Sequence, residues 1–404
     1  MKRKRILMLA PDLGYGGAEK SFSRWAEILS EKHEVIRVVF NKAGNNTYLA
    51  DHNVISLDVP AGKNVFSKVK FFQERIVKLK KIKKELRPDI SISFLEGADY
   101  VNVLSRQSEK VILSIRGSKQ YDSNISGLLG WMRHRILMPY LYNRADRITV
   151  VSEGIKQELR EFYHVKPHVP VQVIYNFYDA SRLKALAAEG LSAEWQNLLS
   201  NHEVIVCVGR VARQKNYPFM IRVFKKIKEL RPHVKLLILG DGEEKEALLA
   251  LAEKLNLKAY SNGVPLTSEY DLYFAGMVKN PHAYVSRASL FVLPSLFEGF
   301  PNALAEAMIA GTPAAAANCP YGPAEIFGQP IKEISKPEFL ATGLLLPASE
   351  ETANQNLESV WASALIKALD DKDWRAAVTA NASQRMAVFN EEQFDKDCSE
   401  MLGS

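Results

Sequence analysis

The residues best suited to chemistry are two glutamates in the stretch FEGFPNALAEAMIAGTP, residues 297–313. Glu298 follows an apolar run and precedes a glycine, so we predict that it stands in a tight turn at the end of a strand. Glu306 falls about one turn inside the segment that follows, whose apolar spacing predicts a helix. A carboxylate at the position of Glu306 can accept hydrogen bonds from ribose hydroxyls. The alternative is that both only favour the helix start electrostatically.

The turn between the two glutamates predicts an anion site. Pro301 suits the first position of a helix, which leaves the backbone amides of Gly299, Phe300 and Asn302 near the helix N-terminus. Free amides and the helix dipole both favour a negative group there. We therefore expect a phosphate at this turn.

Two cations follow another apolar run. Arg210 and Lys215 stand in VGRVARQKN, just past the predicted strand of residues 204–209. Cations at the carboxyl end of a strand suit a diphosphate, whose charge must be stabilised when its bond to a sugar breaks. A solvated basic loop is the alternative.

Weaker signals follow other predicted strands. Gly240, in LGDG, lets backbone approach a ligand because it has no side chain. The segment GYGGAEKS lacks the glycine order of a dinucleotide-binding fold, which disfavours NAD, but Gly17 still opens a helix whose N-terminus suits an anion. Arg116 and Ser118 end a further strand and could reach a ligand cleft; surface positions are the alternative.

Short apolar runs alternate with helical segments in both halves of the 404-residue chain. This pattern predicts an α/β fold with parallel sheets covered on both faces. The length predicts two doubly wound, Rossmann-like domains in series, facing each other across a cleft at the carboxyl ends of their strands. We expect domains at 1–178 and 179–385, and a last helix at 386–404. The spacing of that helix leaves open whether it packs back on the first domain.

Charge is uneven along the chain. Residues 1–178 carry 30 Lys and Arg against 18 Asp and Glu, which suggests an anionic partner for the first half. Residues 63–87 alone hold ten cations and two glutamates. This segment places an apolar stripe on one helical face, formed by Val65, Val69, Phe72, Ile76 and Leu79. A basic amphipathic helix predicts contact with anionic lipid headgroups, and a solvated helix that covers the sheet is the alternative.

Several classes of function are disfavoured. Nucleic acid is not expected, because aromatic residues are not interleaved with the cations as stacking platforms. No apolar run is long enough to span a bilayer, and the first one is too short for a signal peptide. The three cysteines are far apart and no metal-ligand spacing appears, so we expect a cytoplasmic protein without a metal.

Taken together, the motifs resemble those of the retaining GT-B glycosyltransferases of family 4, often called group 1. The resemblance covers nearly the whole chain through GGAEKSFSRWAEIL, VVSEGIKQEL, VIYNF, VGRVARQKN, LGDG, FAGMVKNP and the glutamate pair. It implies that Glu298 contacts the donor sugar, that Arg210 and Lys215 hold the diphosphate, and that Glu306 binds the ribose. It also implies donor contacts from the backbone of Gly17, Gly240, Met277, Val278, Gly299, Phe300, Pro301 and Asn302.

The reaction implied is metal-independent transfer of a hexosyl or N-acetylhexosaminyl unit from a UDP-sugar, with no other cofactor. The acceptor would be a hydroxyl of a glycan or a polyprenyl-diphosphate-linked saccharide, in surface polysaccharide biosynthesis such as lipopolysaccharide or capsule. The enzyme would then work in the cytoplasm or at the inner face of its membrane. Alternatives are a GT-B sugar-nucleotide epimerase and a non-catalytic nucleotide-sugar-binding protein.

Two departures from the family pattern stand out. Arg116 occupies a position where many relatives have histidine, so that histidine's role does not transfer. Residues 259–271 form an insertion that the resemblance does not explain. The sugar, the acceptor, the linkage and the oligomeric state are not fixed by the sequence.

Overall fold

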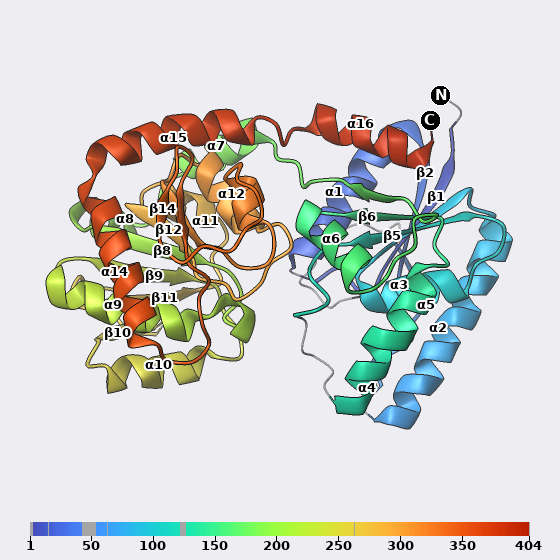
Figure 1. Cartoon of the computed structure of the whole chain (residues 1–404), viewed down its shortest axis with the longest axis horizontal. Coiled ribbons are helices and arrows are strands. Elements are labelled where there is room, and N and C mark those ends of the chain that lie inside the picture. Colours follow the sequence, from blue (N-terminus) through green and yellow to red (C-terminus); the bar gives the residue numbers. More distant parts are fainter. Residues whose placement is uncertain are drawn as a thin grey trace. The chain divides into compact units, whose positions relative to one another are not determined.

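The computed structural model describes residues 3–14, 16–42, 54–62, 64–121, 127–261 and 263–403. The chain divides into two compact units: unit 1 comprises Met1–Asn176 and Phe394–Ser404, and unit 2 comprises Phe177–Gln393. Each unit contains one sheet (Figure 1). Lys63 of the predicted basic helix and Asn262 of the insertion lie outside the described residues.

The sheet of unit 1 is parallel throughout the described strands, in the order β3-β2-β1-β4-β5-β6-β7. The strands are near-continuous apolar runs, as expected when helices cover both faces. They are β1 (Arg5–Ala10), β2 (Glu34–Val39), β3 (Val54–Ser56), β4 (Ile90–Phe94), β5 (Lys110–Ile115), β6 (Arg147–Val150) and β7 (Val171–Val173).

Helices connect these strands and pack on both faces of the sheet. Phe22 and Trp25 of α1 each lie 5.3 Å from the ring of Phe94, whereas α2 and α3 pack against the face that carries Leu7 and Leu9. The helices of this unit are α1 (Gly17–Lys32), α2 (Val65–Leu86), α3 (Glu96–Leu104), α4 (Gly127–Met132), the π-helical turn η1 (Arg133–Leu137), α5 (Met138–Tyr142), α6 (Glu153–Glu161) and α16 (Glu391–Leu402).

The C-terminal helix α16 returns to unit 1. The Phe394 ring lies 5.1 Å from that of Trp25, and Lys32 forms an ion pair of 2.6 Å with Asp395. The side-chain amide of Gln172 also donates to the backbone carbonyl of Asp397 at 3.1 Å. Residues from Phe394 onward therefore belong to the first sheet's unit although they end the chain.

The sheet of unit 2 has the order β10-β11-β9-β8-β12-β13-β15-β14. Its described strands are parallel except for the edge pair β14 and β15. They are β8 (Val204–Val208), β9 (Lys235–Leu239), β10 (Ala259–Ser261), β11 (Leu272–Gly276), β12 (Leu290–Leu293), β13 (Ala314–Ala317), β14 (Glu338–Phe339) and β15 (Leu344–Leu346). The two parallel sheets confirm the predicted fold class.

The core of unit 2 lies between this sheet and its helices, with fully buried side chains such as Phe219, Phe224 and Trp361. The helices are α7 (Ala180–Ala188), α8 (Ala193–Asn201), the 3₁₀ turn η2 (Arg213–Lys215), α9 (Tyr217–Leu230), α10 (Lys245–Lys254), α11 (Pro281–Val285), α12 (Asn302–Ile309), α13 (Pro323–Ile326), α14 (Gln355–Asp370) and α15 (Lys372–Met386). All three cysteines are free and buried.

The apolar stripe of α2 faces the sheet. Leu79 is fully buried, and Phe72 and Ile76 pack against the same core. Three apolar side chains of α2 are nevertheless exposed, Phe66 and Val69 in its first turns and Val77 near its middle. The part of the stripe from Phe72 to Leu79 therefore covers the sheet, whereas Val69 is exposed on the solvent side together with most cations of α2.

Candidate active site

The loops after the carboxyl ends of β8 and β12 bring two of the predicted residues together, the cation Lys215 and the carboxylate Glu298. These strands are neighbours in a parallel sheet, so the loops that follow them meet at the same edge. The backbone amide of Leu296 donates to the carbonyl of Gln214 at 2.9 Å, which ties the loops to each other. The result is an ion pair of 2.6 Å between Lys215 Nζ and Glu298 Oε1.

Glu298 is held from several sides. Its Oε1 accepts from the Ser295 hydroxyl at 2.7 Å, and its backbone amide donates to the carbonyl of Pro320 at 2.8 Å. Gln214 fixes the same turn by donating to the carbonyl of Phe297 at 2.8 Å. Only 7% of Glu298 is exposed, so the carboxylate has a fixed position at the strand end, as a group that orients a sugar requires.

Arg210 lies apart from this pair. Its guanidinium is largely exposed and bonds Glu243 at 3.0 Å. An exposed pair of this kind is weak, because water screens both charges. Arg213, in the same loop, is instead joined to Glu351.

The glycines at these strand ends serve close backbone packing. Gly240 has φ of +143°, and a Cβ on it would lie 1.9 Å from the carbonyl oxygen of Gly209. Gly240 also donates to the carbonyl of Gly276 at 2.9 Å, which joins the ends of β9 and β11. Beneath them the buried Tyr217 hydroxyl donates to Gly209 O at 3.3 Å, and burial raises the pKa of this phenol well above its usual value. Gly240 thus lets two loops approach each other at the edge where we expect the ligand.

The turn after Glu298 leads into α12, which begins at Asn302 with Pro301 as its N-cap. The prediction that Pro301 is the first helical residue is wrong by one position, because the ψ of Pro301 is extended at 102°. The Phe300 ring is buried and lies 5.2 Å from that of Phe389, so its side chain serves packing and leaves its backbone for a ligand. The Asn302 side chain accepts from the hydroxyl of Tyr178 at 2.7 Å.

Glu306 lies in the second turn of α12, where its Oε2 is 3.9 Å from His282 Nε2. His282 stands on α11, which follows the carboxyl end of β11, and only 8% of it is exposed. Sequence reasoning did not select His282, although its place after a predicted strand was a usable signal. Met277 and Val278 occupy the loop between β11 and α11, with 65% of Met277 exposed.

In unit 1 the predicted residues have structural partners. Arg116 bonds the side chain of Asn176 and lies over the Trp25 ring at 5.5 Å. The Ser118 hydroxyl donates to Glu158 at 2.6 Å, and burial raises the pKa of this glutamate. Gly17 opens α1. The structure thus gives Arg116 and Ser118 roles in holding the loop after β5.

A polar cluster that sequence reasoning missed follows the carboxyl end of β4. Glu96 is ion-paired with the buried Arg133 and accepts from the hydroxyl of Tyr100. Burial alone would raise the pKa of Glu96, but the bonds from Arg133 and Tyr100 and the charge of Lys119 outweigh it and lower this pKa. Leu95 before it has φ of +72°, a conformation that L residues adopt rarely and that concentrates at functional sites. The rule of strand carboxyl ends would have identified Glu96.

Comparisons with known proteins fit this arrangement. Sucrose-phosphate synthase from Thermosynechococcus elongatus superposes with a TM-score of 0.76 at 16% identity, covering 99% of this chain and 98% of that one. HepE of Anabaena, solved with UDP-glucose, superposes with a TM-score of 0.73 at 19% identity, covering 99% of this chain and all of that one. The two parallel sheets therefore form a GT-B fold.

Sequence comparisons identify the family to which the chain belongs. The profile "Glycosyltransferase Family 4" matches residues 15–182 and "Glycosyl transferases group 1" matches residues 193–385. The chain belongs to glycosyltransferase family 4, and it is a retaining glycosyltransferase.

Two relatives match over most of their length. An uncharacterized glycosyltransferase of Methanocaldococcus jannaschii is 29% identical over 347 residues, which are 80% of this chain and 81% of that protein. A Campylobacter jejuni enzyme is 27% identical over 400 residues, 96% of this chain and 97% of its own. It is named N-acetylgalactosamine-N,N'-diacetylbacillosaminyl-diphospho-undecaprenol 4-alpha-N-acetylgalactosaminyltransferase.

Proposed function

We propose that this glycosyltransferase moves a hexosyl or N-acetylhexosaminyl unit from a UDP-sugar to a hydroxyl of a polyprenyl-diphosphate-linked saccharide or another glycan. The observation that carries the proposal is the fixed Glu298 carboxylate beside Lys215 at the carboxyl edge of the second sheet. The names of two Campylobacter jejuni relatives, both N-acetylgalactosaminyltransferases acting on undecaprenol-linked glycans, support the acceptor class. The complexes of HepE with UDP and UDP-glucose support the donor class.

The candidate site residues of unit 2 have distinct roles in this reaction. The donor diphosphate binds Lys215 and Arg210. On binding it replaces Glu298 as the partner of Lys215 and Glu243 as the partner of Arg210. Glu298, released from its lysine, accepts hydrogen bonds from the hydroxyls of the sugar. The ribose lies at Glu306, and the base lies against the backbone of Met277 and Val278.

The phosphate groups are stabilised by amides as well as by cations. Gly299, Phe300 and Asn302 supply backbone amides at the start of α12, where the helix dipole adds to them. Gly240 lets the loops after β8 and β9 approach each other at the same edge of the sheet. Charge that develops on the leaving diphosphate is thus met by groups already in place.

The chemistry retains the configuration of the anomeric carbon by a front-face route. The bond between the anomeric carbon and the phosphate oxygen breaks, and the acceptor oxygen bonds the same carbon from the same side. The acceptor proton passes to an oxygen of the departing diphosphate. In this route Glu298 positions the sugar and the cations stabilise UDP.

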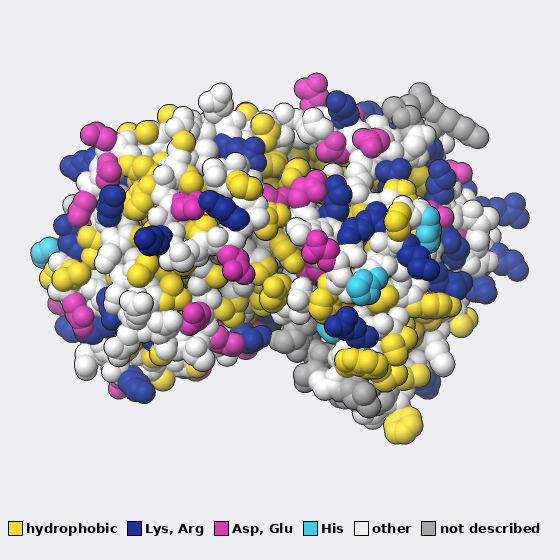
Figure 2. Space-filling model, in the orientation of Figure 1, with side chains coloured by type: hydrophobic (Ala, Val, Ile, Leu, Met, Phe, Trp, Pro, Cys, Tyr) yellow, Lys and Arg dark blue, Asp and Glu magenta, His cyan; other side chains and the backbone are white. Residues whose placement is uncertain are grey.

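A lipid-linked acceptor requires the enzyme to work at a membrane surface. None of the described helices is long and apolar enough to cross a bilayer. The described surface of α4, η1 and α5 exposes apolar side chains, including Trp131, Ile136 and Tyr140. Figure 2 shows yellow side chains over α4 and a concentration of dark blue ones near α2 in the same unit. This combination of apolar and basic groups supports peripheral contact with an anionic membrane at its cytoplasmic face.

The test is acceptor-dependent release of UDP. Purified protein is incubated with UDP-glucose, UDP-galactose, UDP-GlcNAc and UDP-GalNAc, each with and without a polyprenyl-diphosphate-linked saccharide. We expect one donor to release UDP only when the acceptor is present. UDP-sugar binding without any release would favour a nucleotide-sugar-binding protein, and a changed sugar without acceptor would favour an epimerase.

A further inference from the structure

A basic hollow lies at the edge of the first sheet where the strands begin. It has a volume of about 660 Å³ and is lined by the last turns of α2 and by the loop between α3 and β5. Its cations are Lys80, Lys83, Lys84, Arg87 and Arg106. Pro88 and Glu109, which also line it, lie within two residues of the starts of β4 and β5. The hollow is therefore at the opposite end of the strands from Glu96, which follows β4.

The cations of α2 fall into two groups with different surroundings. Lys78 and Lys81 each have a glutamate four residues away, Glu74 at 2.9 Å and Glu85 at 3.9 Å. These are the pairs that stabilise an exposed helix.

The group that faces the hollow has no such partners. The exposed side chains of Lys80, Lys84 and Arg87 form no ion pair with any described residue. They lie three or four positions apart with Lys83 among them, a spacing at which like charges on a helix repel each other. A bound anion would relieve this repulsion.

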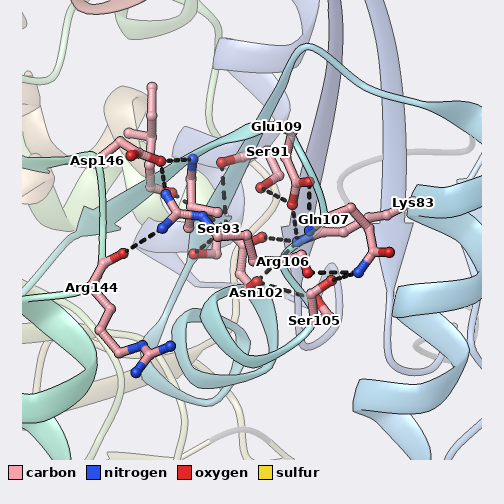
Figure 3. A network of polar contacts seen from close by, with 12 residues as sticks. Lys83, Ser91, Ser93, Asn102, Ser105, Arg106, Gln107, Glu109, Arg144 and Asp146 are labelled. Atoms are coloured by element: carbon pink, nitrogen blue, oxygen red, sulfur yellow. Dashed lines mark hydrogen bonds and ion pairs between the residues drawn. The ribbon is translucent and has the colours of Figure 1, made fainter.

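Lys83 is the buried cation of the hollow, and its ammonium group already makes three polar contacts within the protein. Its ammonium donates to the carbonyl and to the side-chain oxygen of Asn102 at 2.9 and 2.7 Å, and bonds Glu109 at 2.7 Å (Figure 3). Burial lowers the pKa of Lys83 to about 8, against the opposing effect of Glu109. Lys83 therefore fixes the shape of the hollow, and contacts with a ligand fall to Lys80, Lys84 and Arg87.

The wall opposite α2 is also fixed. Arg106 bonds Asp146 and the carbonyl of Arg144, and Gln107 donates its backbone amide to Glu109 at 2.9 Å (Figure 3). The hollow is thus a preformed feature with three uncompensated cations at its rim, and rigid walls reduce the entropy lost when a ligand binds.

We propose that this hollow binds a phosphate-bearing ligand through Lys80, Lys84 and Arg87. An arginine fork can hold two phosphate oxygens at once, and the two lysines add point charges. The same chemistry fits the headgroup of an anionic phospholipid and a free phosphate compound. The site is separate from the candidate active site of unit 2 and does not depend on the proposed reaction.

The experiment compares two triple variants of α2 with the same change in net charge. K80Q/K84Q/R87Q removes the rim of the hollow, and K68Q/K70Q/K81Q removes three cations of the same helix that do not line it. Binding of inorganic pyrophosphate is measured by calorimetry, and flotation with phosphatidylcholine vesicles containing phosphatidic acid tests the headgroup. Both variants keep the candidate active site, so pyrophosphate bound there contributes equally to the two titrations.

We expect the hollow variant to lose at least tenfold in affinity in one of the two arms. The control variant should keep the wild-type affinity for pyrophosphate, and in vesicle flotation it should lose clearly less than the hollow variant, because its three cations only add to the general charge of α2. A loss in calorimetry indicates a free phosphate compound as the ligand, and a loss in vesicle flotation indicates a lipid headgroup. Unchanged thermal midpoints show that both variants are folded. Equal losses in the two variants, or no binding by the wild-type protein in either arm, would overturn the proposal.

Discussion

Lys215 and Glu298 form the central contact of the candidate active site, with 2.6 Å between Nζ and Oε1. Both side chains are mostly buried, at 16% and 8% exposure, and Ser295 donates to the same carboxylate oxygen at 2.7 Å. The pair places two opposite charges at the carboxyl edge of the second sheet, where a diphosphate and a sugar would bind. Removing one partner of such a pair leaves the other uncompensated, so the two residues must be tested with variants that keep the shape.

Glu298→Gln tests the carboxylate. Glutamine keeps the size of the side chain and can still accept from Lys215, but it loses the charge that strengthens bonds to sugar hydroxyls. We expect transfer to fall about 100-fold or more, which corresponds to ~3 kcal/mol of transition-state stabilisation. UDP release measures the rate, and the thermal shift produced by UDP should persist.

The matched control is Glu246→Gln, which changes an exposed glutamate on α10 of the same unit. It should leave the rate unchanged. If Glu298→Gln transfers sugar at a rate within twofold of the wild-type rate, Glu298 has no role in the candidate active site.

The two arginines of the loop after β8 give a second test. Arg210 has an exposed partner in Glu243, whereas Arg213 is joined to Glu351 through two nitrogens. If Arg210 binds the donor diphosphate, Arg210→Ala should raise the donor KM about tenfold, a loss of ~1.4 kcal/mol. Arg213→Ala should change the KM by less than twofold. Similar effects of the two substitutions would indicate a general charge effect of the loop.

Much of unit 2 could be predicted, because the sequence patterns that mark its strand ends and functional residues are local. An apolar run followed by Arg and Lys, and another followed by Glu-Gly-Phe-Pro, predict two strand ends that carry functional groups. That Lys215 contacts Glu298 depends on β8 and β12 being neighbours, and the strand order is set by packing over the whole sheet.

The features that the sequence left open or did not indicate have physical reasons. The periodicity of α2 showed an apolar stripe, but periodicity does not say whether a sheet or a membrane covers it, and Leu79 is buried in the core. Arg133 pairs with Glu96 but lies 37 positions away from it in the sequence. Its segment has no apolar strand pattern, so nothing local indicated this contact. The Lys83 pair with Glu109 likewise joins a helix to a distant loop. Such contacts depend on tertiary structure.

Gly240→Ala tests the close approach of the loops after β8 and β9. The added Cβ would meet the carbonyl oxygen of Gly209 at 1.9 Å, and φ of +143° is strained for any L residue with a side chain. We expect a loss of about 2 kcal/mol or more in the free energy of unfolding and weaker UDP binding. Gly190→Ala is the control, because a Cβ there has no neighbour within 4 Å. Equal stability of the two variants by urea denaturation would show that the backbone relaxes freely at Gly240.

Asp99 gives a prediction for pH. It is fully buried on α3, its Oδ1 accepts from the Ser93 hydroxyl at 2.7 Å, and its Oδ2 has no hydrogen-bond partner among the described residues. Burial raises the pKa of this carboxyl well above its usual value, and the nearby Glu96 raises it further, while Ser93 and Lys119 lower it only in part.

Because the pKa of Asp99 is higher in the folded state than in the unfolded chain, the native state binds more protons between these two values. The stabilisation from this proton is complete below the unfolded pKa of about 3.9 and is lost as the pH rises through the folded pKa. Asp99→Asn removes the charge, so its stability relative to wild type should rise with pH between pH 4.5 and pH 8. Urea unfolding across this range measures the difference, with the exposed Asp373→Asn as control. A stability difference that stays constant with pH would mean that the Asp99 carboxyl does not change protonation on folding.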